Sequence, residues 1–413
     1  MHEEHKKIME SNSKIELNEN FFAFVKKHLG EDAMRLRLKK FGDIDFPIEL
    51  AITQIEARGR RLERKIPLWT ANERIVFPSI LSTEQCSSQE TAQYKANLVV
   101  GQSLCDLTGG LGIDTFFMAQ QVKEAVYIEQ NTLYSQCAWH NFDELGAQHI
   151  SVVNSDCNTF LTQSTQKFDT IYIDPARRGK SQERLFALAD CEPNVLAMMP
   201  TLLKRCKRLI IKLSPMVDIT MLRQELACDN AIHIVSLNNE CKEILAVIDT
   251  DKETAETTKC NITCSVITRS KGVQTYKFDP MAEQNAVQTT VNDLKRYLYE
   301  PDTAILKAGM FKSVCQRFGV EKLHKNSHLY TSQNLVAEFP GRSFIVNEVL
   351  PFSSRLCKEF AKQYKCCNIA TRNFPLSAVE LRKKLKCGDG GDIYLFATTI
   401  GNNEHILIMC NKS

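Results

Sequence analysis

The segment Cys105-Asp106-Leu107-Thr108-Gly109-Gly110-Leu111-Gly112 constrains the fold of this 413-residue chain more than any other. An apolar run over 98–107 leads into it, and a helical pattern over 113–121 follows at once. This order predicts a strand, a glycine-rich turn and a helix, and the absent side chains would let the backbone contact a nucleotide-like ligand. A glycine fingerprint alone fits a plain tight turn equally well, so the segments that follow decide between the two.

Acidic residues recur where the next predicted strands end. Glu129 closes the run 125–128 and stands 23 positions after Asp106, near the spacing of about 20 that suits an acid gripping ribose hydroxyls. Asp156 follows the short run 152–153, and Asp174 closes the alternating run 168–173. Doubly wound sheets bind ligands at the carboxyl ends of their strands. Four acids in this order therefore predict one binding edge on an α/β sheet.

The series resembles the class I S-adenosylmethionine-dependent methyltransferases over roughly residues 88–249. The resemblance implies that the glycine turn holds the methionine end of the cofactor, that Glu129 pairs with the ribose hydroxyls and that Asp156 lies beside the adenine. A dinucleotide oxidoreductase, the alternative, would have a tighter G-x-G-x-x-G turn than the G-G-x-G found here. The implied cofactor-binding residues are Asp106, Thr108, Gly109, Gly110, Gly112, Asp114, Glu129, Gln130, Asp156, Cys157 and Asp174.

The fourth motif, Asp174-Pro175-Ala176-Arg177, lines the methyl-transfer centre in the family, and the catalytic residues predicted from it are Asp174, Pro175, Arg177 and Lys212. Exocyclic-amine enzymes carry an aromatic residue at the position of Arg177. The motif also resembles that of uracil-C5 enzymes, but Lys212-Leu213-Ser214-Pro215 lacks the cysteine nucleophile they need. Ribose 2′-O methylation is a third possibility, and its acidic and basic residues would be Lys95, Asp174, Lys212 and Glu243.

The distribution of charge points to a polyanionic substrate. Residues 301–413 hold 16 Lys and Arg against nine Asp and Glu, whereas residues 101–300 hold 20 against 25. A basic appendage on a methyltransferase fits RNA, although a solvated basic helix without a partner would look the same. The substrate-binding residues predicted on this basis are Lys95, Arg177, Arg178, Arg382, Lys383 and Lys384.

The chain divides into four predicted parts: a helical N-terminal region (1–92), a methyltransferase domain (93–250), a small α+β, ferredoxin-like domain (260–340) and a THUMP-like domain (341–413). One long helix is expected from Pro47 to Lys65. The runs 232–237 and 244–248 are too close for a crossover helix and must pair antiparallel. They would close a Rossmann-like sheet of seven strands, while a hairpin over 261–278 would belong to the third part.

The last part, with Phe374-Pro375-Leu376-Ser377 before a basic helix, resembles the THUMP-like C-terminal domain of a group of bacterial class I methyltransferases. The resemblance extends to the stretch 87–96 and to Leu213-Ser214-Pro215. THUMP domains proper bind RNA in tRNA-modifying enzymes, so the resemblance implies a tRNA or rRNA substrate. Two alternatives stay open: a methyltransferase acting on small molecules or proteins, and an RNA-binding factor that keeps the cofactor pocket without turnover.

Composition sets the remaining expectations. No run of about 18 apolar residues occurs, and the N-terminus lacks the apolar stretch of a secretory signal, so we expect a cytoplasmic protein without a membrane span. Sixteen scattered cysteines in a long chain suggest reduced thiols. The spacings Cys260-x3-Cys264 and Cys366-Cys367 have no matching second half, so no metal site is expected. The oligomeric state stays open.

Overall fold

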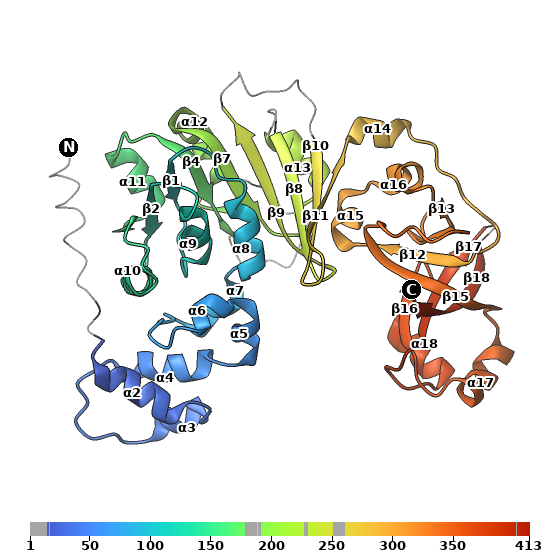
Figure 1. Cartoon of the computed structure of the whole chain (residues 1–413), viewed down its shortest axis with the longest axis horizontal. Coiled ribbons are helices and arrows are strands. Elements are labelled where there is room, and N and C mark those ends of the chain that lie inside the picture. Colours follow the sequence, from blue (N-terminus) through green and yellow to red (C-terminus); the bar gives the residue numbers. More distant parts are fainter. Residues whose placement is uncertain are drawn as a thin grey trace. The chain divides into compact units, whose positions relative to one another are not determined.

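The computed structural model describes residues 15, 17–177, 188, 191–226, 230–250, 261–401 and 403–413 (Figure 1). They form two compact units. The first contains Met1–Asn230 and Ile244–Thr258, and the second contains Ala231–Glu243 and Lys259–Ser413. The polar linker expected after residue 250 lies outside the described residues.

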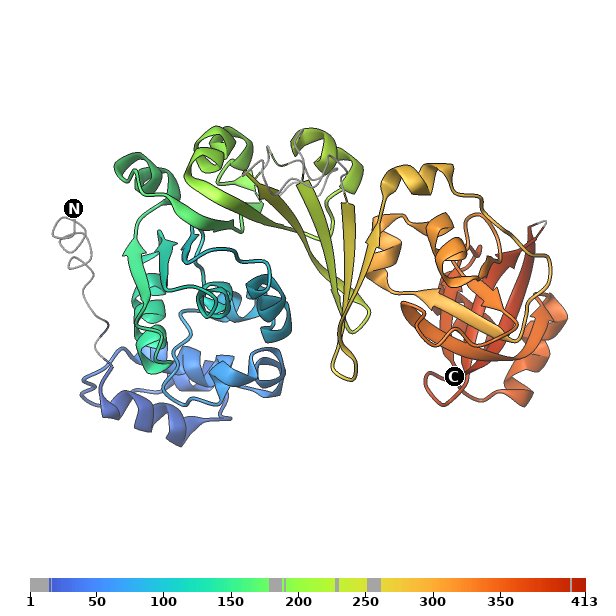
Figure 2. The ribbon, with the colours of Figure 1, turned by 45° about the horizontal axis from the view of Figure 1, so that its top comes forward.

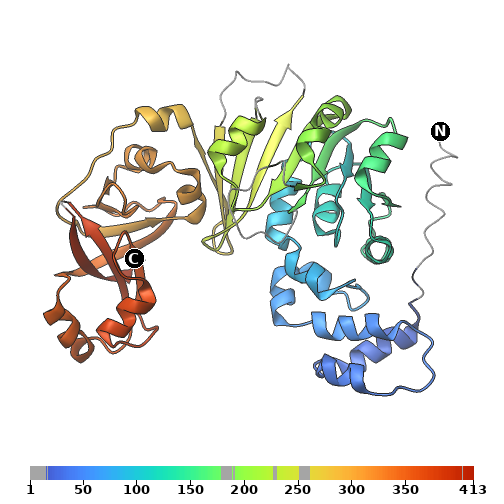
Figure 3. The same ribbon diagram turned by 180° about the vertical axis from the view of Figure 1, so that it is seen from behind.

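The N-terminal region is helical, as predicted. Helices α2 and α4 lie side by side (Figure 3). They pack around buried Phe21, Leu50 and Ile55, in a cluster that also includes Cys137 of the later helix α10 (Thr132–Glu144). Side chains of Asn18, Asp32, Ser79 and Ser88 cap four of the helices by accepting hydrogen bonds from backbone N–H groups. The helices are α2 Glu19–His28, α3 Ala33–Leu38, α4 Ile48–Ala57, α5 Arg60–Lys65, α6 Pro67–Thr70, α7 Ile80–Gln85 and α8 Gln89–Ala96.

The prediction of a single helix from Pro47 to Lys65 was wrong, because α4 ends at Ala57 and a separate helix, α5, begins at Arg60. Arg58 ends α4 with an extended backbone (ψ 122°), and Gly59 follows in an extended conformation. The Arg58 guanidinium donates hydrogen bonds to the carbonyls of Glu73 (3.0 Å) and Ile75 (2.6 Å). These contacts, made with residues 15 and 17 positions later, hold Arg58 away from a continuing helix.

The large sheet has the predicted Rossmann-like α/β architecture. Its parallel part runs in the order β3-β2-β1-β4-β7, and β9 then pairs antiparallel with β7 beside β8. Strands β8 and β9 are hydrogen-bonded neighbours with only Asn238 and Asn239 between them, so they pair antiparallel and the predicted closing hairpin is confirmed. The strands are β1 Ser103–Asp106, β2 Glu124–Glu129, β3 Ile150–Asn154, β4 Phe168–Ile173, β7 Cys206–Leu213, β8 Asn230–Leu237 and β9 Glu240–Asp249. The helices are α9 Ile113–Ala119, α10 Thr132–Glu144, α11 Cys157–Gln163, α12 Val195–Arg205 and α13 Ile219–Leu226.

The sheet is longer than the seven strands predicted. The hairpin of β10 (Asn261–Thr268) and β11 (Gly272–Phe278), expected to belong to a separate small domain, extends the same sheet. Strand β10 pairs parallel with β8 along seven residues. Six consecutive residues of β10 are buried, which is typical of a strand covered on both faces. A short two-stranded sheet, β5 (Ala176–Arg177) with β6 (Cys191–Glu192), lies apart from it.

The second sheet has seven strands in the order β13-β14-β12-β15-β18-β17-β16. Strands β12 and β15 pair antiparallel, so the segments before and after residue 340 share one sheet. Helices α17 and α18 pack on this sheet around Phe360, Leu381 and Leu407 (Figure 2). The strands are β12 Tyr297–Pro301, β13 Glu321–Lys322, β14 Tyr330–Ser332, β15 Gly341–Pro351, β16 Asn368–Arg372, β17 Tyr394–Ile400 and β18 Glu404–Lys412. The helices are α14 Pro280–Asn285, α15 Thr303–Ala308, α16 Phe311–Phe318, α17 Ser354–Gln363 and α18 Ala378–Leu385.

Within the part of the chain that the structure describes, no helix is both long and apolar enough to cross a bilayer. The cysteines in that part are free thiols.

Candidate functional site

The glycine turn (residues 106–112) is held by two side chains, one from β1 and one from β2. Asp106, at the end of β1, accepts hydrogen bonds from the Thr108 N–H (2.9 Å) and from the Thr115 hydroxyl (2.5 Å). Tyr127 of β2 donates its hydroxyl to the carbonyl oxygen of Gly110 (2.5 Å). A Cβ added to Gly109 would lie 2.1 Å from the Tyr127 ring, so only glycine fits there without a shift of its surroundings. The Tyr127 ring therefore packs directly against the backbone of the turn.

Glu129 closes the turn from the adjacent strand end. Its Oε2 accepts from the Gly110 N–H (2.9 Å) and its Oε1 from the Asn131 N–H (2.7 Å). Gly110 has φ +56°, in the left-handed region that favours glycine. The predicted cofactor acid and the predicted glycine turn are thus in direct contact, and Gln130 follows as an exposed residue.

Asp156 stands at the end of the next strand and caps α11. Its Oδ1 accepts from the Asn158 and Thr159 N–H groups, both at 3.0 Å. Hydrogen bonds from Thr159 lower the pKa of this carboxyl, which therefore stays ionised at neutral pH. Cys157 is the buried first residue of α11. The three strand-end acids Asp106, Glu129 and Asp156 therefore follow neighbouring parallel strands of one sheet, as predicted.

Asp106 differs from the other two because it is buried. Its desolvation raises the pKa to about 7, although the hydrogen bonds from Thr115 and Thr108 oppose the change. The negative charges of Asp114 and Asp174 act in the same direction as burial. The Asp106 carboxyl consequently changes its protonation near neutral pH.

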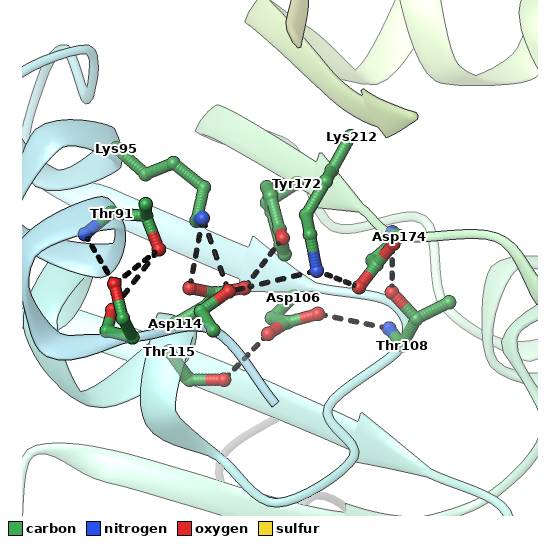
Figure 4. Close-up of polar contacts among 11 residues, drawn as sticks. Thr91, Lys95, Asp106, Thr108, Asp114, Thr115, Tyr172, Asp174 and Lys212 are labelled. Carbon is green, nitrogen blue, oxygen red and sulfur yellow. Dashed lines mark hydrogen bonds and ion pairs between the residues drawn. The ribbon is translucent and has the colours of Figure 1, made fainter. Parts of the chain in front are cut away.

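A chain of alternating charges runs beside the turn (Figure 4). The Lys95 ammonium, fully buried in α8, lies 3.2 Å from Asp114 Oδ1. The Lys212 ammonium lies 3.9 Å from Asp114 Oδ2 and 2.5 Å from Asp174 Oδ2. Asp174 is held in turn through its backbone N–H, which donates to the Thr108 hydroxyl (2.6 Å). Two ammonium groups and two carboxylates thus alternate from the N-terminal region to the end of β4.

Asp114 is the hub of this chain. Besides the two lysines it accepts hydrogen bonds from the Tyr172 hydroxyl and the Ser87 hydroxyl, both at 2.8 Å on Oδ2. Burial alone would raise its pKa, but the charges of Lys95 and Lys212 and the two hydroxyls outweigh burial, so the pKa lies below its ordinary value. Asp114 is therefore a carboxylate that holds both lysines in place.

Sequence reasoning named Asp114 only as a cofactor residue and missed Ser87 and Tyr172. One signal was available in α8, where Ala92, Lys95 and Ala96 are all buried. A lysine is almost never fully buried without a partner, so its place between alanines calls for a carboxylate. Nothing in the sequence marks Asp114, 19 positions later, as that partner.

The remaining predicted residues fall into three groups. Pro175 is buried directly after Asp174, whereas the side chain of Arg177 and the whole of Arg178 lie outside the described residues. Glu243 is buried in β9 and belongs to the second unit, while Lys95, Asp174 and Lys212 belong to the first. Lys383 and Lys384 are exposed on α18.

Arg382, predicted to bind substrate, is engaged inside the protein. Its guanidinium donates to the carbonyls of Cys367 (3.2 Å) and Gly388 (2.6 Å) and pairs with Asp389 (2.6 Å). These bonds fasten α18 to the loop that follows it. In the described part of the chain, no three His, Cys, Asp or Glu side chains come together as metal ligands.

The glycine turn and its acids fit an adenosine-containing cofactor without phosphates. Residues 106–112 include no lysine or arginine that would pair with a phosphate, and Glu129 presents a carboxylate suited to a vicinal diol. Glu129, Asp156 and the turn 106–112 would hold such a cofactor, which supplies an electrophilic methyl group when bound.

Comparisons with known proteins agree with this fold and site. The chain is 34% identical to a candidate methyltransferase from Porphyromonas gingivalis W83 of known crystal structure, over 99% of this chain and 98% of that one, with a TM-score of 0.85. An uncharacterized S-adenosylmethionine-dependent methyltransferase of Mycobacterium tuberculosis is 21% identical over 77% of this chain and 83% of its own length. Ribosomal RNA small subunit methyltransferase J of Francisella philomiragia is 30% identical over 24% of this chain and 45% of its own length.

Family profiles match the second unit. Residues 297–340 match a ferredoxin-like domain, and residues 341–412 match the THUMP domain-like family. The chain belongs to the class I S-adenosylmethionine-dependent methyltransferases that carry a THUMP-like domain. It is an enzyme, and S-adenosylmethionine is its cofactor.

Proposed function

We propose that the enzyme methylates RNA, either tRNA or rRNA. The observation that carries this proposal is the THUMP domain-like segment 341–412, because THUMP domains proper bind RNA. The excess of Lys and Arg over Asp and Glu after residue 300 gives this part the charge that a polyanion requires. The name of the Francisella relative, a ribosomal RNA methyltransferase, supports the same substrate class.

Within this proposal, Asp174 is the catalytic residue at the acceptor. Methyl transfer from a sulfonium forms the acceptor–carbon bond as the sulfur–carbon bond breaks, and the acceptor loses one proton. Asp174 closes β4 and is 37% exposed, so its carboxylate is accessible to accept a hydrogen bond from the acceptor. Lys212, at 2.5 Å, is a positioning residue that fixes the direction of this carboxylate. Asp114 attracts Lys212 from the buried side and is itself paired with Lys95.

The test uses purified enzyme and methyl-labelled S-adenosylmethionine, with total RNA, a protein extract and a small-molecule extract as separate acceptors. We expect label in RNA alone. Asp174→Asn should lower the rate of transfer by about 10²- to 10⁴-fold while cofactor affinity stays within a few-fold of wild type. Glu129→Ala should instead weaken cofactor binding, measured by calorimetry, because it removes the carboxylate offered to the diol.

Label in protein or in small molecules, with none in RNA, would refute the substrate part of the proposal. RNA binding that weakens steeply with salt, without methyl transfer to any acceptor, would instead support the alternative of an RNA-binding factor without turnover. Mass spectrometry of RNA nucleosides from a deletion strain, compared with its parent, would identify the modified nucleotide.

A further inference from the structure

A cavity lies within the second unit, and all of its lining residues belong to that unit. Its volume is about 650 Å³, inside the range of about 300–1,000 Å³ that is usual for ligand pockets. The cavity lies where β16 and β17 end and β18 begins, and the β13–β14 connection also contributes to its wall. The segments 297–340 and 341–412 both line it, so neither segment alone forms the site. Its main lining residues are His324, Lys325, Asn373, Phe374, Thr399 and His405.

Hydrogen bonds of side chains with one another and with the backbone hold the wall of this cavity in one arrangement. The Asn326 N–H donates to His324 Nδ1 (3.2 Å), so that nitrogen carries no proton. His324 Nε2 is then the donor to Asn403 Oδ1 (3.1 Å), and the Asn373 amide NH₂ also donates to Nδ1 (3.0 Å). Thr399 joins the same wall through its hydroxyl, which donates to the Asn373 carbonyl (2.5 Å). Three separate loops are thus tied to one buried imidazole.

Two of the lining asparagines adopt left-handed backbone conformations. Asn373 has φ +50° and Asn403 has φ +70°. Asparagine tolerates this region better than most residues, yet such conformations cluster at functional sites. Both residues are exposed and line the cavity, and their amide groups bond the His324 ring.

The chemistry of the lining suits one unit of a nucleic acid. Among the described residues, no Asp or Glu lines the cavity, and Lys325, an exposed residue, is part of its lining. The Phe374 ring packs nearly perpendicular to the Phe352 and His405 rings, with centroid distances of 5.0 and 5.4 Å, so its position in the cavity wall is fixed. An aromatic side chain held in this way can stack with a base. Amides and hydroxyls can pair with the edges of an unstacked base, and an ammonium can pair with its phosphate.

We propose that this cavity binds a single unstacked nucleotide of the RNA substrate. The site is additional to the methyl-transfer centre, and the proposal rests on the proposed function because it takes RNA as the substrate. Lys325 pairs with the phosphate, Phe374 stacks with the base, and the Asn373 and Asn403 amides contact the base edge.

The test measures binding of 5′-phosphorylated ribotetranucleotides of A, C or U to the full-length protein by fluorescence anisotropy, without S-adenosylmethionine. We expect at least one of them to bind, and Lys325→Gln and Phe374→Ala each to weaken it by about tenfold. Asn403→Gly removes the amide but keeps the left-handed backbone accessible, and it should also weaken binding. Lys358→Gln, on exposed Lys358 of α17, is the matched control and should change nothing.

Three outcomes would overturn the cavity proposal. The first is that none of the tetranucleotides binds. The second is that Lys325→Gln and Asn403→Gly, with unchanged circular dichroism, bind the tetranucleotides as tightly as the wild type. The third is that inorganic phosphate binds as tightly as the tetranucleotides, which would show an anion site only. Because the assay involves no turnover, Glu129→Ala should bind tetranucleotides normally. Tetranucleotide binding at the cavity with no methyl transfer to RNA would refute the proposed function alone.

Discussion

Replacing Lys95 with methionine would leave Asp114 as a buried carboxylate without its nearest counter-ion. Breaking a buried ion pair by removing one partner costs about 3–5 kcal/mol. Asp114 would keep its hydrogen bonds from the Tyr172 and Ser87 hydroxyls and the more distant Lys212 ammonium at 3.9 Å. We therefore expect the free energy of unfolding to fall by about 3 kcal/mol, at the lower end of that range. A loss of about 1 kcal/mol lowers the melting temperature of a domain of about 150–250 residues by about 2–4 °C. The expected decrease in melting temperature is therefore about 6–12 °C.

Thermal and urea unfolding of the cofactor-free protein would measure this loss. The double variant Lys95→Met with Asp114→Asn removes both charges and should regain much of the lost stability. Lys207→Met is the control, because the Lys207 side chain in its 2.7 Å pair with Asp169 is 61% exposed, and such pairs contribute about 1 kcal/mol or less. A double variant no more stable than Lys95→Met, or equal losses for Lys95→Met and Lys207→Met, would contradict the reasoning.

Two further predictions concern the glycine turn and its acid. Gly109→Ala places a Cβ 2.1 Å from the Tyr127 ring and should weaken S-adenosylmethionine binding more than tenfold by calorimetry, whereas Gly42→Ala, with nothing within 4 Å, should have no effect. The pKa of Asp106 is about 7 in the folded state, against about 3.9 for an unfolded aspartate. Between these two pH values the folded state binds more protons than the unfolded state. The free energy of unfolding therefore falls by about 4 kcal/mol as the pH rises from 4 to 7. Asp106→Asn should remove this decrease, and urea unfolding at pH 5 and pH 8 that shows the same pH dependence in both proteins would refute the assignment.

The sheet edge shared by the strand-end acids could be predicted because it depends on local order along the chain. Each acid follows an apolar run, and parallel strands bring their carboxyl ends to one edge whatever the details of packing. Asp106, Glu129 and Asp156 therefore lie where the sequence pattern placed them. Their roles toward the cofactor stay predictions.

Features fixed by tertiary contacts could not be predicted in this way. Apolar residues continue at helical spacing through Leu62, and the break before it depends on Arg58 bonding to carbonyls in a later segment. Strand β10 reads as half of an isolated hairpin, because nothing local indicates that β8 will pair with it. The Lys95–Asp114 contact joins two helices whose sequences carry no shared motif.

The burial of Lys95 has a consequence for how this enzyme can be dissected. Helix α8 comes before the first strand of the Rossmann-like sheet, so a fragment designed to start at β1 would discard the ammonium that neutralises Asp114. Such a fragment would keep every cofactor motif yet lack the charge balance around Lys212. A minimal catalytic fragment should therefore begin before Ser87, whose hydroxyl belongs to the same cluster.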